Sequence, residues 1–152
     1  MAEVKVKTTV KLRASADCPS HSRADVSVRD LMSSIDEPTE RGGTNSGPTP
    51  TDTALGALIG CTNVIGHKCA KSLGVDIGHL KIEAVCDFDR RGVTLAEEIE
   101  VPFERIVLTV TADGSASQAD LDRVASETDK YCPLSKLFIN AGTKLDVIWS
   151  KD

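Results

Sequence analysis

The chain has 152 residues, of which 40% are hydrophobic, 27% are charged and 3% are aromatic, and its formal net charge is −5. These values are typical of one soluble domain with an aliphatic core, so we expect a single domain over residues 1–152. The negative charge, the lack of a dense Lys/Arg cluster and the scarcity of aromatic rings argue against nucleic acid as a partner.

The sequence also limits location and metal chemistry. No apolar run approaches the roughly 20 residues of a membrane span, so we expect no membrane partner. The first residues alternate Val with Lys and resemble neither a signal peptide nor a transit peptide, which favours the cytoplasm. The five cysteines would be mainly reduced there. None of them forms a CxxC or CxxH pair, so no metal site is expected.

The N-terminal third is predicted to form strands followed by a loop. Residues 3–12 alternate Val or Leu with Lys, which indicates a half-buried strand. After a turn over 16–23, residues 24–38 favour one or two more strands and complete an antiparallel meander. The stretch 37–50 is rich in Gly, Pro, Ser and Thr and predicts a loop, either a flexible linker or a loop beside a functional site.

A long helix is predicted from Pro50 to the residue before Gly74. Thr49 suits the N-cap, Pro50 the first helical position and Asp52 the third position of a capping-box-like pattern, while Gly74 suits the C-terminal cap. Because each helical residue turns by about 100°, Cys61 falls on the apolar face. Five apolar residues share this face: Ala54, Ala57, Leu58, Val64 and Ile65.

The other side of this helix needs cover as well. If a single sheet buries one helix face, then Gly56, Ile59 and Gly60 stay open to solvent. We therefore expect an obligate homodimer with a large apolar interface.

The rest of the chain alternates strands and helices, so the fold class is α+β. The pattern predicts a strand over 79–89, a charged connector, a strand over 103–114, a helix capped by Ser117, a short helix opening at Cys132–Pro133 and a final strand over 143–150.

Cys132 stands out because it precedes Pro133, a residue favoured at the first position of a helix. A thiol at a helix N-terminus faces free N–H groups, which stabilise its thiolate. Two interpretations stay open: a reactive thiol, or a small buried helix cap. Cys69 and Cys86 are expected in the core, and Cys18 in an exposed turn.

Two stretches together resemble the osmotically inducible protein C and organic hydroperoxide resistance family (OsmC/Ohr). They are "GPTPTDTALGALIGCTNVIGHKCAKSLG", which contains Cys61, and "YCPLSKLF", which contains Cys132. Their order and separation match the family, and the resemblance covers essentially the whole chain.

The resemblance implies an OsmC-like intertwined homodimer with its sites at the subunit boundary and a role in the stress response. It implies a thiol peroxidase that reduces small organic hydroperoxides, with Cys61 as the peroxidatic thiol and Cys132 as the resolving thiol. The sulfenic acid formed on Cys61 would condense with Cys132 to a disulfide. A dithiol reductant, often a lipoyl protein, would restore both thiols without a metal or flavin cofactor.

The chain departs from the family pattern at one position. Hydroperoxide-reducing members carry Glu after the Pro that starts the central helix, where this chain has Thr51 and places Asp52 one residue later. Asp52 is therefore either an electrostatic helper or only a cap. Arg13 and Arg23 are candidates for the family's thiolate-stabilising Arg. The alternative function is a non-catalytic dimer that binds a small apolar or thiol-reactive ligand at the subunit interface.

Overall fold

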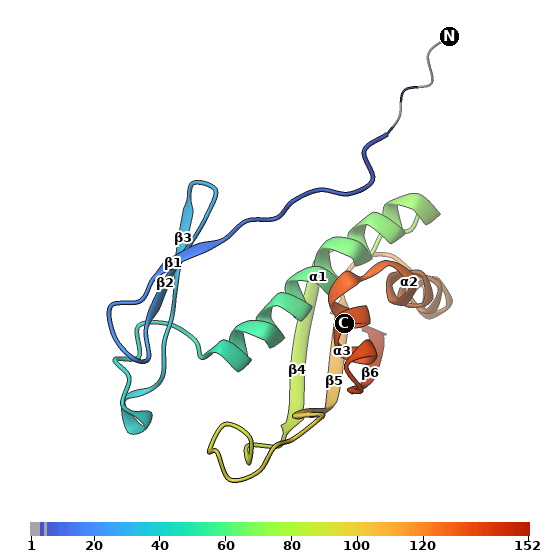
Figure 1. Cartoon of the computed structure of the whole chain (residues 1–152). Helices are drawn as coiled ribbons and strands as arrows, with labels where there is room; N and C mark the ends of the chain where they lie inside the picture. The colour runs from blue at the N-terminus through green and yellow to red at the C-terminus, as the bar shows by residue number, and fades with distance from the viewer. Residues whose placement is uncertain (1–3, 5) are drawn as a thin grey trace. The chain divides into compact units, whose positions relative to one another are not determined.

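The computed structural model of the chain describes residue 4 and residues 6–152 (Figure 1). Its internal contacts group the chain into two compact units, residues 1–53 and residues 54–152. The single domain expected over residues 1–152 stays a prediction.

The first unit contains an antiparallel sheet of three short strands in the order β1-β2-β3. These strands are β1 (Ser15–Asp17), β2 (Ala24–Val28) and β3 (Leu31–Ile35), followed by a 3₁₀ turn at Thr39–Arg41. Residues 24–38 therefore supply two strands, and the predicted meander is confirmed from β1 onward.

The first predicted strand is wrong over the residues that the structure describes. Residue 4 and residues 6–12 belong to no strand, and the apolar side chains there are 68–92% exposed. Residues 3 and 5 lie outside the described part. Alternating Val and Lys provide an apolar face, but a strand also needs a neighbour to accept and donate its backbone hydrogen bonds. No described residue pairs with this segment.

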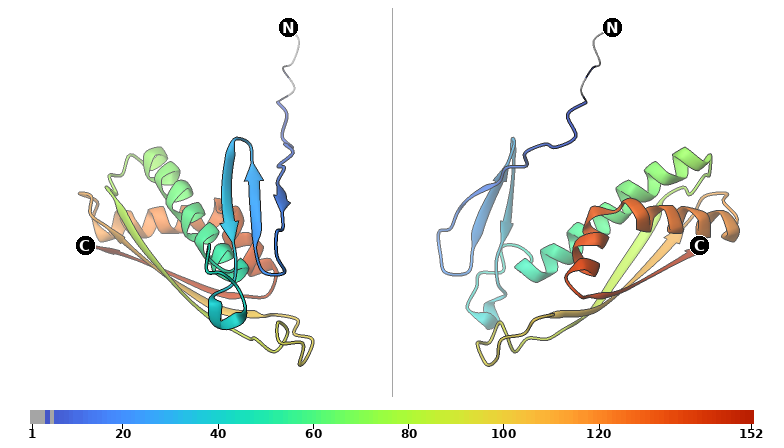
Figure 2. Two further views of the ribbon diagram at one scale, coloured as in Figure 1. Left: turned by 90° about the vertical axis from the view of Figure 1, so that its left-hand side faces the viewer. Right: turned by 45° about the vertical axis from the view of Figure 1, so that its right-hand side comes forward.

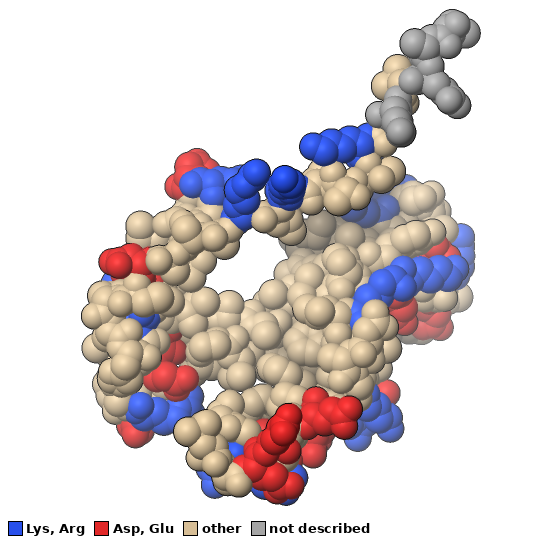
Figure 3. Space-filling model, in the orientation of Figure 1, with Lys and Arg blue, Asp and Glu red and all other residues tan. Residues whose placement is uncertain are grey.

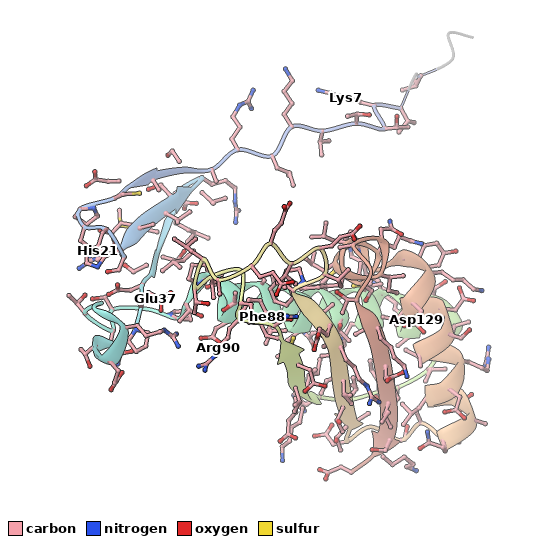
Figure 4. All side chains as sticks on the ribbon, turned by 60° about the horizontal axis from the view of Figure 1, so that its bottom comes forward. Lys7, His21, Glu37, Phe88, Arg90 and Asp129 are labelled. Carbon is pink, nitrogen blue, oxygen red and sulfur yellow. The ribbon has the colours of Figure 1, made fainter. Side chains whose placement is uncertain are left out.

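The loop after β3 is built around the carboxylate of Asp36, which is fully buried. It accepts the N–H groups of Glu37 (labelled in Figure 4), Thr44 and Ser46 at 2.8–3.1 Å, and the Thr44 hydroxyl at 2.6 Å. The Thr44 hydroxyl and the Ser46 N–H hold the pKa of Asp36 far below its usual value. Gly43 lets the loop close, because a Cβ there would overlap the Glu37 carbonyl.

Helix α1 (Pro50–Leu73) begins and ends where the sequence predicts. The Thr49 hydroxyl accepts the N–H of Asp52 at 3.1 Å and donates to the Asp52 carboxylate at 2.7 Å. Gly74 ends the helix with φ +68°, a conformation that favours glycine.

The second unit contains another three-stranded sheet, in the order β4-β5-β6, so the described residues form two sheets instead of the single one expected. Strands β4 and β5 are antiparallel, whereas β5 and β6 are parallel because two helices form the crossover between them. Figure 2 shows the helices on one face of this sheet. The elements are β4 (Leu80–Phe88), β5 (Phe103–Ala112), α2 (Gln118–Tyr131), α3 (Pro133–Asn140) and β6 (Lys144–Lys151).

The core of this unit lies between the sheet and the helices. Alternate residues of β5 point to the helices and are fully buried, as period-two patterning requires. The fully buried aliphatic side chains are Leu58, Ile106, Leu108, Val110, Leu121 and Val124.

Trp149 connects β6 to α1. Its indole ring lies against Gly66, where a Cβ would approach the ring to 2.9 Å and where the side chain of Leu80 is also near. Trp149 is 5% exposed, and among the described residues its Nε1 is the one buried side-chain nitrogen or oxygen without a hydrogen-bond partner. The close approach explains why a glycine stands inside this helix.

The described residues include no helix with the length and apolar character needed to cross a membrane. On the face that Figure 3 shows, both Lys or Arg and Asp or Glu side chains are present. The expectation that nucleic acid is not a partner stays a prediction.

Candidate active site

Two thiols that are 71 positions apart in the sequence meet in the second unit. The Cys132 thiol donates a hydrogen bond to the Cys61 sulfur, and the two Sγ atoms lie 3.1 Å apart. Both cysteines are free thiols. A disulfide bond is about 2.05 Å long, so an approach of about 1 Å would link the two sulfurs. The prediction that these cysteines are neighbours in the fold is confirmed.

Cys132 occupies the junction between α2 and α3. Its N–H donates to the carbonyl of Thr128 and ends α2, while its side chain caps α3, as the order Cys132–Pro133 predicts. The Ser135 N–H donates to the Cys132 sulfur at 3.4 Å. A sulfur therefore fills the position that an oxygen fills in an ordinary N-cap.

The surroundings of the pair are apolar. Cys132 is fully buried within a cluster that includes Leu58, Leu108 and Phe138, and Cys61 packs against this cluster from α1 while remaining partly exposed. Cys61 is therefore the member of the pair that a dissolved molecule can reach.

Burial has the largest effect on the pKa of Cys61, the more exposed thiol. It raises the pKa of Cys61, the Leu134 N–H opposes this effect by stabilising the thiolate, and the neighbouring Cys132 raises the pKa further. Burial also raises the pKa of Cys86, a third thiol that packs against the same cluster from β4. Cys86 lies two residues before the end of β4 at Phe88, which is labelled in Figure 4.

The sequence predicts free N–H groups at the Cys132 thiol, and the Ser135 N–H confirms this, because an N-cap side chain usually accepts the N–H two or three positions later. Sequence reasoning missed the backbone N–H of Leu134, which serves Cys61. The N–H that serves Cys61 depends on tertiary packing and has no sequence signal.

The predicted apolar face of α1 is confirmed only in part. Leu58 is buried and Ala54 and Ile65 are half-buried, but Ala57 and Val64 are exposed in the chain. A helical wheel gives the direction of a side chain and not the partner that covers it, which explains the difference.

The other thiols lie mostly as expected: Cys69 is buried, Cys86 is half-buried and Cys18 is exposed. Among the described residues, no group of three or more His, Cys, Asp or Glu side chains could hold a metal ion.

Asp52, Arg13 and Arg23 belong to the first unit. There Asp52 caps α1 with Thr49, and Arg23 donates to Asp25 at 2.9 Å. A role for Asp52, Arg13 or Arg23 at the thiol pair stays a prediction.

A groove of about 300 Å³ opens between α1 and α2 close to the pair in sequence. Ile65 lies one helical turn after Cys61 and Tyr131 directly precedes Cys132, and both line this groove together with Cys69 and Leu73. Lys68, Ser72 and Glu127 complete the lining, but most of its surface is apolar.

The family model of the OsmC-like proteins matches residues 43–148, so the chain belongs to the OsmC-like protein family. A search of curated proteins found no match.

Several solved structures share the fold at low sequence identity. The OsmC-like protein from Mycoplasma pneumoniae is 16% identical, with a TM-score of 0.78 over 93% of this chain and 97% of that one. An organic hydroperoxide resistance protein from Elizabethkingia anophelis is 16% identical, with a TM-score of 0.68 over 97% of this chain and 100% of that one. One from Legionella pneumophila is 15% identical, with a TM-score of 0.67 over 95% and 99%. The α+β, OsmC-like fold predicted from the sequence is confirmed.

Proposed function

We propose that this protein is a thiol-dependent peroxidase that reduces small organic hydroperoxides. The observation that carries the proposal is the 3.1 Å separation of the Cys61 and Cys132 sulfurs, with Cys61 partly exposed and Cys132 buried. The Cys61 thiolate attacks the peroxide oxygen and becomes a sulfenic acid, and Cys132 then displaces water to form a disulfide. The Elizabethkingia and Legionella proteins with this fold are organic hydroperoxide resistance proteins, which supports this reaction class.

The groove between α1 and α2 is our candidate for the organic part of the substrate. It starts one turn from Cys61, exposes mainly apolar surface between Lys68 and Glu127, and has the size of a small-molecule site. An alkyl tail held there would bring the peroxide oxygens to the more exposed thiol.

We also propose that the protein works as a homodimer in the cytoplasm, within the stress response. A Cβ added at Gly56 or Gly60 would meet no described atom within 4 Å, so this face of α1 has room for a second helix. A dithiol, such as a lipoyl protein, would reduce the disulfide, and no bound cofactor takes part. Light scattering tests the assembly, and a stable folded monomer would contradict it.

A second candidate function is binding without turnover. It is favoured by Thr51, which replaces the Glu of the hydroperoxide-reducing members, and by burial, which raises the pKa of Cys61 and so disfavours its thiolate. The same groove would then hold a small apolar or thiol-reactive ligand.

One assay separates the two functions. The wild-type protein is mixed with an alkyl hydroperoxide and a dithiol, and peroxide consumption is followed beside Cys61→Ser and Cys18→Ser. Cys18 is the matched control, because it is an exposed thiol outside both the pair and the groove. Catalytic consumption that is lost only with Cys61→Ser supports the peroxidase. Wild-type consumption no faster than that of Cys61→Ser would favour binding without turnover.

A further inference from the structure

We propose that the groove between α1 and α2 selects hydroperoxides that carry a carboxylate on an aliphatic chain. Lys68 binds the carboxylate, the apolar lining holds the chain, and the peroxide group lies at Cys61. The inference rests on the proposed peroxidase function and assigns the substrate class of that reaction, with Lys68 as a residue that determines specificity.

The accessible thiol and part of the groove lie on one stripe of α1. Because each helical residue turns by about 100°, three residues of the groove fall within about 40° of the direction of Cys61. They are Ile65, Lys68 and Ser72. Ile65 also packs against the cluster that contains Cys132, so it connects the thiol pair with the groove. A molecule that is stretched along this stripe can therefore contact the groove and Cys61 together.

The helix sets the spacing between the thiol and the charge. Lys68 follows Cys61 by seven residues, which is two turns or about 10 Å along the helix axis. An aliphatic chain of similar length spans the two positions, with the peroxide at one end and the anion at the other. Lys68 is exposed and belongs to none of the ion pairs that the described residues form, so its ammonium group is open to a ligand.

The wall that α2 contributes does not cancel this charge. Glu127 also lines the groove, but its carboxylate accepts the Lys130 ammonium group at 2.6 Å. Together with Lys68, this ion pair leaves one net positive charge at the groove. Ser72 and Tyr131 add hydroxyl groups, which can donate to a carboxylate. A mainly apolar groove with one net positive charge complements an aliphatic chain with one anionic end.

The first test measures binding and needs no peroxide. Reduced wild type and Lys68→Met are titrated with decanoate and with decanol by calorimetry; methionine keeps an aliphatic side chain and removes the charge. Lys71→Met is the matched control, because Lys71 is an exposed lysine of the same helix outside this groove. We expect Lys68→Met to weaken decanoate binding about three- to five-fold, with decanol binding and the control unchanged. Absence of decanoate binding by wild type, or equal losses in the two variants, would overturn the proposal.

A second pair of variants tests where the anion binds. Ser72→Trp places an indole ring in the groove, whereas Ser126→Trp places the same ring at an exposed position of α2 outside it. We expect decanoate binding to be lost in Ser72→Trp and kept in Ser126→Trp. Wild-type affinity in Ser72→Trp would show that the ligand lies elsewhere and would overturn the site.

A turnover assay separates this inference from the peroxidase function. It compares two linear hydroperoxides, with the hydroperoxyl group at one end and either a carboxylate or its methyl ester at the other. We expect Lys68→Met to raise KM for the acid about three- to five-fold at unchanged kcat, and to leave the ester unaffected, because Lys68 binds a part of the substrate that does not react.

The outcomes of the two assays are distinct. If neither hydroperoxide is consumed but decanoate binding depends on Lys68, the proposed peroxidase function is wrong and the ligand class stands. If both hydroperoxides are consumed and Lys68→Met affects them equally, the peroxidase function stands and the inference is overturned.

Discussion

The two units each bury an acidic group under backbone N–H donors, with opposite results. Asp36 in the first unit accepts three N–H groups and a hydroxyl, and its pKa falls far below the usual value. Cys61 in the second unit has the Leu134 N–H to oppose its burial, and its pKa rises. The number of donors, set against desolvation, decides the sign of the shift.

The difference separates a structural acid from a reactive one. A carboxylate with all its acceptor positions filled stays charged and holds a loop in place. A thiol with one donor has a raised pKa, and that pKa depends on its neighbouring groups as well as on burial. The following predictions test this comparison, beginning with the largest expected effect.

Replacing Asp36 with Asn should destabilise the first unit most. Both carboxylate oxygens accept N–H donors, so either orientation of the amide turns its NH₂ toward an N–H group. We expect the melting temperature to fall by roughly 5 °C or more. Asp30→Asn, at an exposed carboxylate in the turn between β2 and β3, is the control and should change little. Equal melting temperatures for the two variants would show that the donors around Asp36 contribute nothing.

The free energy of unfolding should fall at both acid and alkaline pH. The lowered pKa of Asp36 means that its contribution is present above about pH 4 and is lost as the pH falls below that value. The raised pKa of Cys61 means that its contribution is present below about pH 8.5 and is lost as the pH rises above it.

Urea unfolding from pH 2 to pH 10 would measure the loss of stability at acid and at alkaline pH. Asp36→Asn should flatten the acid side alone and Cys61→Ser the alkaline side alone, with Cys18→Ser as an exposed-thiol control. An alkaline loss that is unchanged in Cys61→Ser would assign it to another group, of which Cys86 has the same sign.

Removing one N–H donor from the thiol pair should shift its reactivity without changing any side chain. Ligation of a synthetic segment that begins at Cys132 can place an ester in the bond before Ser135, which deletes the N–H on the Cys132 sulfur. We expect the pH midpoint of Cys61 oxidation to rise, which slows oxidation at pH 7 by up to about ten-fold.

The matched control for this experiment is an ester before Lys136, whose N–H donates to the Cys132 carbonyl within α3 and not to sulfur. The control should lose helix stability and keep the midpoint. If both esters shift the midpoint equally, the effect comes from the helix as a whole and not from the donor on sulfur.

The smallest effect is expected at the start of α1. Asp52→Asn should cost about 0.3–1 kcal/mol of stability, since the charge near the helix N-terminus and the bond to Thr49 are weakened. If Asp52 only caps, the rate of Cys61 oxidation should not change. A fall in that rate much larger than the loss of stability would give Asp52 an electrostatic role.

Most elements could be predicted because their signals are local. Pro50, Gly74 and Ser117 mark helix ends through backbone requirements that act within one turn, and the alternation in β4 and β5 is set by one covered face. The strand predicted over 3–12 is wrong at residue 4 and residues 6–12, because pairing depends on a partner that the alternating pattern cannot specify.

In the candidate site, too, only the features with a local sequence signal could be predicted. The order Cys132–Pro133 predicts a thiol at a helix start, and the resemblance to the OsmC/Ohr family connects it with Cys61. The burial of Asp36 and the Leu134 N–H at Cys61 arise from chain segments that meet only after folding, so neither has a sequence signal.

The contact between Trp149 and Gly66 gives the protein an internal optical reporter. Trp149 is the only tryptophan in the chain, and its ring lies against α1 five residues after Cys61. An indole that is shielded from water emits at shorter wavelengths than an exposed one. Any loosening of α1 from the sheet during the redox cycle would therefore appear as a red shift of the intrinsic fluorescence, without a label and on the time scale of a stopped-flow experiment.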